Sequence, residues 1–187
     1  GTDITHLVKT RADLEKTEKG HRELLEGLSE GVWEVDMEGN TIFANSPMAD
    51  MLGYTQEEMK DINVFSVIAP EDSFRAEGVF SERTSGEAGA SEYVYIRKDG
   101  ARIKVLSASR PSYDDEGNIR GALGIITDIT EQKMMESMLL FERKQLISIF
   151  DSIDELIHVS DPHTYEVLYI NEAMKNIFGD IEGRKCH

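Results

Sequence analysis

The middle of the chain alternates between short runs of strand-forming residues and tight turns. Turns are expected at residues 37–40, 98–101 and 114–118, each built around an acidic residue followed by glycine. The Asp99-Gly100 pair, set between two strand-like runs, is a strong hairpin signal. Five runs with strand character surround these turns: Val32–Val35, Thr41–Ala44, Glu92–Arg97, Arg102–Ser109 and Ile119–Thr127. The pattern predicts an antiparallel sheet.

The stretch from Ser46 to about Arg83 has helical character but is interrupted. Thr55 followed by Glu58 forms a capping box, and Pro70 followed by two acidic residues favours a helix start. The small, Gly-rich residues 84–90 are expected to form a mobile loop. Two strands, several short helices and three further strands predict an α+β fold with the helices collected on one face of the sheet.

Both ends of this module continue into charged helical stretches with apolar residues at heptad spacing. In residues 3–29 the seam consists of Ile4, Leu7, Leu14, Leu25 and Leu28, interrupted by Arg11, Glu18 and His21. In the second stretch it consists of Ile129, Leu139, Leu146, Phe150 and Ile153, interrupted by Gln132, Glu136 and Arg143. Such seams predict a homodimer held by a marginal coiled coil. A helix that packs on its own domain is the alternative.

An internal repeat organises the whole chain. The tripeptide Asp-Ile-Thr occurs at residues 3–5 and again at 128–130, and each copy precedes a charged helical stretch and two strand-like runs. The second run ends at Asn45 in one copy and at Asn171 in the other. The tripeptides lie 125 positions apart and the asparagines 126, because the second turn has one extra residue. We therefore expect the end of one module, one whole module and the beginning of a third.

Taken together, these motifs resemble a PAS sensory domain. They are Gly31–Asp36, Asn45, Met51–Tyr54 with Thr55–Glu58, Pro70–Asp72, Arg97–Gly100, Asp115–Gly117 and Gly121–Thr130. Each motif is weak alone, but their order and spacing are specific. The resemblance divides the chain into a linker helix (1–29), a complete PAS domain (30–130), a second linker helix (131–152) and a truncated PAS domain (153–187).

The resemblance implies a five-stranded antiparallel sheet with short helices on one face, flanked by long N- and C-terminal linker helices. In this family the sheet and helices enclose a pocket that holds haem, flavin, a small metabolite or nothing. The exit motif ties the sheet to the outgoing helix, so Asp128 and Thr130 are expected to couple the two. Residues 153–187 are too short to be stable alone. If ordered, they are expected to lean on another copy or on the middle module.

The expected pocket lining is mainly apolar and aromatic, and the same residues would also suit an ordinary core. Asn45 could offer a polar contact, but it more naturally caps the following helix. Tyr95, Ser107 and Ser109 are the other polar candidates. The candidate lining consists of Val35, Phe43, Met48, Met51, Leu52, Phe65, Ile68, Phe80, Tyr93, Tyr95, Ile103, Val105, Leu123 and Ile125.

The residue types of the middle module argue against a coloured cofactor. No histidine or cysteine lies between Arg22 and Ile157, so His-ligated haem and covalent flavin are not expected in residues 30–130. A small non-covalent metabolite is still compatible. His21 lacks the flanking residues of a phosphoacceptor helix. His158, Asp161 and His163 alternate like metal ligands, but Pro162 marks a turn there, so we expect neither a metal site nor a catalytic site.

Charge and composition narrow the partners further. The formal net charge of −16 disfavours nucleic acid and anionic lipid as direct partners. The single cysteine, Cys186, fits a reducing compartment, and no apolar run approaches the ~18–20 residues of a membrane span. We therefore expect a cytoplasmic segment, whose parent protein could be anchored in a membrane elsewhere.

The sequence favours a sensory input segment of a multidomain signalling protein, with a sensor histidine kinase as the first expectation for its output. A diguanylate cyclase or a transcriptional regulator is an alternative output in the same parent chain. A ligand-free dimerisation and spacer module is the alternative function. No residue pattern supports an enzyme within this chain.

Overall fold

The computed structural model describes residues 24–185, which form two compact units that divide between Glu131 and Gln132. Most of the predicted first linker helix, with its seam residues Ile4 to His21, lies outside the described residues, as does Cys186. Residues 24–26, at the end of that linker, are helical. Within residues 24–185, no helix has both the length and the apolar character needed to cross a membrane.

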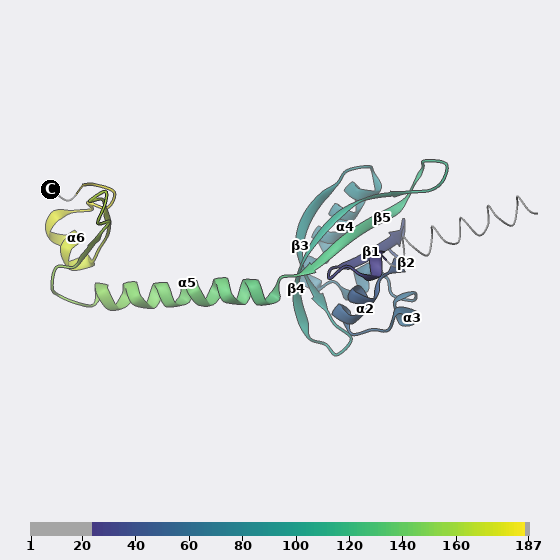
Figure 1. The fold of residues 1–187 in the computed structure, drawn as a ribbon, viewed down its shortest axis with the longest axis horizontal. Coiled ribbons are helices and arrows are strands. Elements are labelled where there is room, and N and C mark those ends of the chain that lie inside the picture. The colour runs from purple at the N-terminus through teal and green to yellow at the C-terminus, as the bar shows by residue number, and fades with distance from the viewer. Residues whose placement is uncertain (1–23, 186–187) are drawn as a thin grey trace, which may run out of the picture. The chain divides into compact units, whose positions relative to one another are not determined.

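Unit 1 is built on a five-stranded antiparallel sheet (Figure 1). Its strands are β1 (Gly31–Asp36), β2 (Thr41–Ala44), β3 (Gly89–Ile96), β4 (Arg102–Tyr113) and β5 (Ile119–Asp128). The strands lie side by side in the order β2-β1-β5-β4-β3, so the first and last strands of the unit pair at its centre. The α+β fold predicted from the sequence is confirmed.

Two strands, β3 and β4, extend several residues beyond their sequence pattern. β3 begins at Gly89, inside the segment that was predicted to be a loop, because residues 89–91 pair with Ser107–Ser109 of β4. β4 continues past Ser109 to Tyr113, and Pro111 lies opposite Ala122 of β5. The hairpin turns fall where expected, with Gly100 and Gly117 in the left-handed conformation at φ 84° and 83°.

Short helices cover one face of the sheet. They are α2 (Ser46–Leu52), α3 (Gln56–Met59), the 3-10 helix η1 (Val64–Val67) and α4 (Pro70–Thr84). The predicted capping box of Thr55 and Glu58 is present. The core lies between these helices and the sheet, and Met48, Leu52, Met59 and Val105 are fully buried there.

A buried asparagine joins three segments of unit 1. The Oδ1 atom of Asn45 accepts hydrogen bonds from the backbone N–H of Val32 (2.8 Å) and of Met48 (3.0 Å). Its Nδ2 atom donates to the backbone carbonyls of Leu25 (2.8 Å) and Glu30 (3.1 Å). One side chain therefore ties the incoming helical turn to β1 and also caps α2, as the sequence predicted for that helix.

Unit 2 repeats this arrangement. It contains all of α5 (Thr130–Asp151) beyond Glu131, followed by β6 (His158–Ser160), β7 (Val167–Ile170) and α6 (Glu172–Phe178). Asn171 takes the place of Asn45: its Oδ1 accepts from the N–H of Ile157 and Met174. Its Nδ2 donates to the carbonyls of Phe150, Ile153 and Glu155. The repeat in the sequence is therefore a repeat in structure.

The elements of residues 153–187 lean on their own linker helix. The ring of Tyr169 lies 6.0 Å from that of Phe150, and its hydroxyl donates to Asp151 Oδ1 at 2.8 Å. The same carboxylate accepts from the N–H of Glu172. This support differs from the two that the sequence argument offered, another copy or the middle module, because the end of α5 supplies the missing apolar surface.

Replacing Asn45 with alanine should destabilise unit 1 by about 3–5 kcal/mol, because it removes the cap of α2 and leaves buried N–H and carbonyl groups without partners. Urea unfolding of the variant, followed by circular dichroism, measures this cost. Asn118→Ala, in an exposed hairpin turn, is the matched control and should cost less than about 1 kcal/mol. Equal costs for the two variants would contradict the junction role of Asn45.

Candidate sensory cavity

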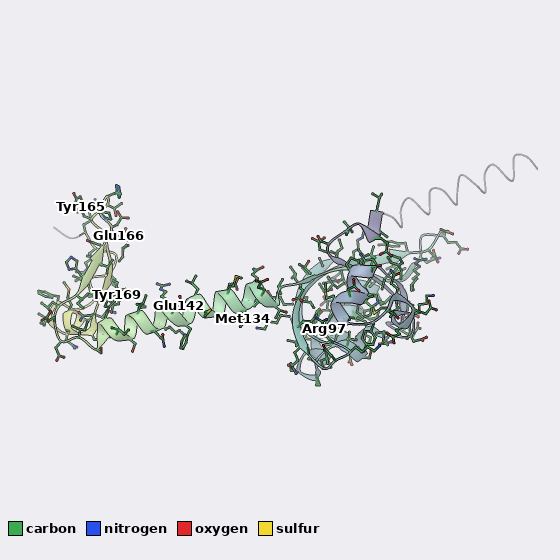
Figure 2. All side chains as sticks on the ribbon, turned by 60° about the horizontal axis from the view of Figure 1, so that its bottom comes forward. Arg97, Met134, Glu142, Tyr165, Glu166 and Tyr169 are labelled. Atoms are coloured by element: carbon green, nitrogen blue, oxygen red, sulfur yellow. The ribbon has the colours of Figure 1, made fainter. Side chains whose placement is uncertain are left out.

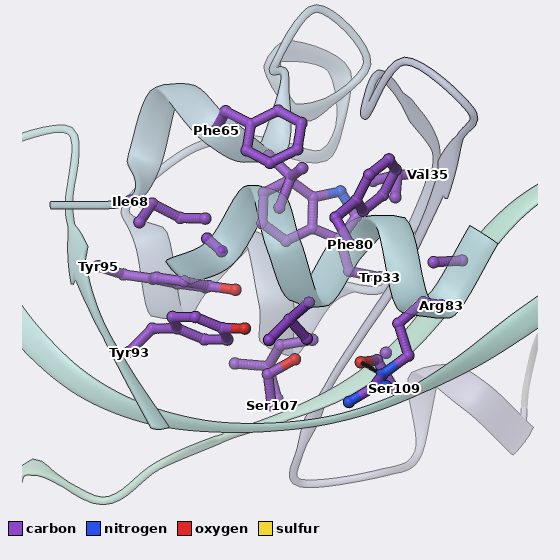
Figure 3. A pocket seen from close by; sticks show the side chains of 16 residues that line it. Trp33, Val35, Phe65, Ile68, Phe80, Arg83, Tyr93, Tyr95, Ser107 and Ser109 are labelled. Carbon is purple, nitrogen blue, oxygen red and sulfur yellow. Dashed lines mark hydrogen bonds between the residues drawn. The ribbon is translucent and has the colours of Figure 1, made fainter. Parts of the chain in front are cut away.

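A cavity of about 60 Å³ lies between the sheet and the helices of unit 1 (Figure 3). Alternate residues of the four strands β1, β3, β4 and β5 form its floor, because successive side chains of a strand point to opposite faces. The segment from η1 to α4 forms its roof. The lining consists of Trp33, Val35, Val64, Phe65, Ile68, Ala76, Val79, Phe80, Arg83, Tyr93, Tyr95, Ser107, Ser109, Ala122, Gly124 and Ile126.

Aromatic rings form most of the cavity wall. Phe65 and Phe80 meet edge to face, with ring centroids 5.2 Å apart, and Trp33 meets Tyr95 edge to face at 6.4 Å. Trp33 pairs with Gly124 across β1 and β5, so the small residue leaves room beside the indole. A Cβ at Gly124 would lie 3.6 Å from Ser107 Oγ and would press on Ile126. The cavity therefore exists because β5 presents small side chains inward.

Arg83 brings a positive charge into this apolar setting. It is buried, with 5% of its surface exposed, and its Nε donates to Ser109 Oγ at 3.1 Å. Its Nη1 lies 3.5 Å from a carboxylate oxygen of Glu82, whose side chain is half exposed. A Cβ at Gly89 would lie 2.6 Å from Arg83 Nη2, so the guanidinium packs against bare backbone at the start of β3.

The tyrosine hydroxyls of the lining stay protonated at neutral pH. Burial raises the pKa of Tyr95 well above its usual value of 10, with Tyr93 adding to the effect and a hydrogen bond with Ser107 opposing it. Burial also raises the pKa of Tyr93, although less. Both groups are therefore neutral and offer hydrogen-bond donors as well as acceptors.

Asp72 fastens the beginning of α4 over the cavity. Its Oδ2 accepts from the N–H of Val94 in β3 at 2.7 Å, and its Oδ1 accepts from Arg75 at 2.7 Å. Burial alone would raise the pKa of Asp72, but the hydrogen bonds from Arg75 and Val94 outweigh it and lower the pKa. The helix that forms the roof is thus held to the edge strand by a charged group.

The structure brings together only part of the lining that the sequence predicted. Of the candidates, Val35, Phe65, Ile68, Phe80, Tyr93, Tyr95, Ser107 and Ser109 border the cavity. Met48, Leu52, Ile103 and Val105 are buried elsewhere in the core, and Met51 is partly buried against it. Phe43 borders a separate surface hollow beside β2. Whether the lining residues bind a ligand stays a prediction.

Ile125 and Leu123 do not border the cavity, because they occupy the opposite face of β5. Ile125 is 48% exposed, whereas its neighbours Gly124 and Ile126 point inward. Both faces of β5 carry apolar residues, so the sequence does not show which face points inward. Sequence reasoning chose the face with the larger side chains. The cavity instead needs the small ones, Ala122 and Gly124, opposite the bulky Val35 and Trp33.

Sequence reasoning also missed Arg83. A signal for it exists: Ala76, Val79 and Phe80 form the apolar stripe of α4 at positions i, i+3 and i+4, and Arg83 occupies i+7 of the same stripe. A cation that continues an apolar stripe into the core is unusual, because a buried charge needs a partner.

The residues expected to couple sheet and helix lie at the end of β5. Asp128 Oδ1 accepts from the N–H of Thr130, the first residue of α5, at 2.8 Å. Thr130 Oγ1 accepts from the N–H of Lys104 in β4, also at 2.8 Å. Between them Ile129 is buried, and its N–H donates to the carbonyl of Lys104. The helix therefore starts directly from the sheet without a loop.

The candidate metal ligands of unit 2 form a turn. Asp161 Oδ1 accepts from the N–H of His163 (2.7 Å) and of Thr164 (2.9 Å), and these bonds lower the pKa of Asp161. Within residues 24–185, no group of three or more His, Cys, Asp or Glu side chains is placed to hold a metal ion.

Comparison with protein families matches residues 29–131, more than half of the chain, to a PAS domain. The chain belongs to the PAS domain family. Residues 144–187 match a second PAS domain model. PAS domains are sensory modules of signalling proteins, so this chain carries one such module and part of another.

Three curated relatives of this PAS segment have names that describe signalling proteins. Sensor protein FixL of Bradyrhizobium diazoefficiens is 25% identical over 83% of this chain, and probable diguanylate cyclase DgcE of Escherichia coli is 24% identical over 89%. The chain spans only 31% and 16% of these two relatives. Sensor histidine kinase WalK of Bacillus subtilis is 23% identical over 79% of the chain.

Solved structures share the fold. The PAS domain of an HTR-like protein from Haloarcula marismortui has a TM-score of 0.57 at 21% identity, covering 65% of this chain and 98% of the other. A sensory box histidine kinase/response regulator from Burkholderia thailandensis has a TM-score of 0.52 at 22% identity, covering 65% and 93%.

Replacing Asp72 with asparagine should destabilise unit 1 by about 1–2 kcal/mol at pH 7, because the charged part of the bonds to Arg75 and Val94 is lost. A lowered folded-state pKa stabilises the fold above the unfolded value near 3.8, and this contribution disappears as the pH falls through the folded value. Urea midpoints should therefore converge as the pH drops below 3.8. A constant gap between wild type and variant across this range would contradict the ionised anchor.

Proposed function

We propose that this chain is a sensory input segment of a larger signal-transduction protein, most naturally a sensor histidine kinase. The state of the cavity in unit 1 is relayed to α5 through Asp128 and Thr130, and α5 passes it onward. The relatives FixL and WalK, a sensor protein and a sensor histidine kinase, support this choice of output. DgcE supports a diguanylate cyclase as the alternative output.

One observation carries the proposal: hydrogen bonds join the sheet to the first residue of α5 with no loop between them. Thr130 begins the helix and at the same time receives a hydrogen bond from Lys104 of β4, a strand that contributes Ser107 and Ser109 to the cavity wall. A shift of β4 caused by a ligand therefore moves the first turn of the helix. No intervening loop absorbs the displacement.

A ligand-free spacer is the second candidate. The small size of the cavity, about 60 Å³, favours it, since drug-sized ligands occupy pockets of roughly 300–1,000 Å³. In that case α5 would only hold two copies together. The two functions differ in one respect: a sensory segment couples the state of the cavity to the output of the parent protein, and a spacer does not.

Replacing both Asp128 and Thr130 with alanine should cost only about 1–2 kcal/mol of stability, because a cap and two exposed hydrogen bonds are lost. The response of the parent protein to its stimulus should nevertheless disappear, since the side-chain hydrogen bond between Lys104 of β4 and the first residue of α5 is lost. The measurement compares output activity with and without stimulus in wild type and variant. A folded variant that responds like wild type would leave these residues with a capping role alone.

We also propose that α5 pairs with a second copy of this chain. None of its residues is buried, although it is rich in large apolar side chains. Met135, Leu139, Leu146 and Ile149 are each 56–69% exposed and follow one another at intervals that form a heptad stripe. Glu142 lies in the middle of this stripe, on the exposed stretch of α5 where Met134 is also labelled (Figure 2).

This stripe differs from the seam drawn from the sequence. Ile129, its proposed first residue, is buried in unit 1. Phe150 packs on Tyr169, and Arg143 borders a hollow that it shares with β6 and β7. Part of the predicted seam is therefore already in contact with other residues of this chain and is not free to pair with a second copy. The stripe Met135-Leu139-Glu142-Leu146-Ile149 shares Leu139 and Leu146 with that seam but leaves out the residues that are already covered, and it has only one polar interruption.

Glu142→Leu should strengthen dimerisation at least about tenfold, because it removes a charge from the centre of the apolar stripe and the repulsion between two copies. Analytical ultracentrifugation of the full chain measures the dissociation constant. Glu136→Leu, the same change on the seam drawn from the sequence, is the matched control and should leave the constant within about threefold. If Glu136→Leu strengthened dimerisation more than Glu142→Leu, the seam predicted from the sequence would be the dimer contact instead.

A further inference from the structure

We propose that the cavity of unit 1 binds a short-chain organic acid, whose carboxylate pairs with Arg83 and whose alkyl end lies among the aromatic rings. This inference rests on the proposed sensory function of the cavity and names the chemical class of its ligand.

The charge of Arg83 is the first argument. A guanidinium carries five N–H donors, and the described contacts occupy one of them with Ser109 and bring another to 3.5 Å from Glu82. The Glu82 carboxylate is half exposed, so water screens its attraction. A buried cation that lacks a strong partner is costly, and an anion within hydrogen-bond reach removes that cost. Carboxylate matches the planar fork of the guanidinium in shape as well as charge.

The position of Arg83 is the second argument. Its Nε is held by Ser109, and its far nitrogen lies against the bare backbone of Gly89, so the guanidinium has a fixed orientation at one end of the cavity (Figure 3). The neutral hydroxyls of Tyr93, Tyr95 and Ser107 line the same floor. They supply further donors for an anion without adding negative charge that would repel it.

The third argument is the size and polarity of the rest of the cavity, which limit the size of the ligand. Apart from Arg83 and the tyrosine and serine hydroxyls the lining is mainly apolar, and the rings of Phe65, Phe80 and Trp33 form the largest part of that apolar surface. The cavity volume of about 60 Å³ is small beside the roughly 300–1,000 Å³ of pockets that hold drug-sized ligands. The ligand is therefore a small acid with a short apolar tail, such as acetate or propionate.

The test uses sodium propionate as the probe and the whole chain as the receptor. Trp33 is the single tryptophan and lines the cavity, so its fluorescence reports occupancy, with calorimetry as an independent measure. We expect saturable binding with a dissociation constant on the order of 1 mM, as suits so small a ligand. Propionamide, equal in size but neutral, should bind at least about tenfold more weakly.

Three variants sharpen the test. Arg83→Gln should weaken propionate at least about tenfold and remove the preference over propionamide. Arg102→Gln removes a surface arginine that pairs with Glu71 and should change nothing. Gly124→Ala keeps Arg83 but narrows the cavity, so it should weaken both probes together. The comparison of the two probes on wild type holds even if Arg83→Gln does not fold.

Equal affinity for propionate and propionamide would overturn the carboxylate class, and so would the absence of binding by either probe. Equal weakening by Arg83→Gln and Arg102→Gln would assign the effect to overall charge and would overturn the site. None of these readouts uses the output of the parent protein. A relay that does not respond, with propionate binding intact, would therefore reject the proposed function and leave the ligand class standing.

Discussion

The fold of this chain depends on how a few buried polar side chains satisfy backbone groups where helices meet the sheet. Asn45 serves four such groups from a fully buried position, and without it the end of the incoming helix, β1 and α2 would each have an unpaired donor or acceptor. An amide is the side chain suited to this task, because it both donates and accepts at one point. Asn171 repeats the same bonds in unit 2, so the arrangement belongs to the repeat and not to local accident.

The sequence predicted the elements well because their signals are local. The capping box at Thr55 and the hairpin turn at Gly100 depend on residues a few positions apart. The extension of β4 through Pro111 was missed because proline lowers strand propensity, while pairing with Ala122 on the neighbouring strand overrides it. Which face of β5 points inward could not be predicted from β5 alone. The inward face is set by packing against the neighbouring strand, because the bulky Trp33 and Val35 of β1 pair with the small Gly124 and Ala122.

The cavity shows the same limit of local reasoning. A search for large apolar residues finds Phe65, Tyr93 and Tyr95, which do line it. It overlooks small residues, whose contribution is the space they leave, and it overlooks Arg83, whose burial only becomes visible once α4 lies on the sheet. Local reasoning also fails to identify the exposed face of α5. The seam predicted from heptad spacing alone included Ile129, which is buried in unit 1, and Phe150, which packs on Tyr169. The exposed apolar residues that remain define a stripe rotated around the helix.

Different kinds of hydrogen bond hold the two ends of unit 1. At the incoming end, the buried Asn45 holds the last helical turn through a partly buried hydrogen bond to the carbonyl of Leu25. At the outgoing end, Thr130 and Asp128 hold the first turn of α5 through partly exposed hydrogen bonds to Lys104 and to the helix itself. Water competes for exposed bonds, so they exchange at lower cost than buried ones. The hydrogen bonds at the outgoing end therefore break at lower cost than those of the buried Asn45 at the incoming end.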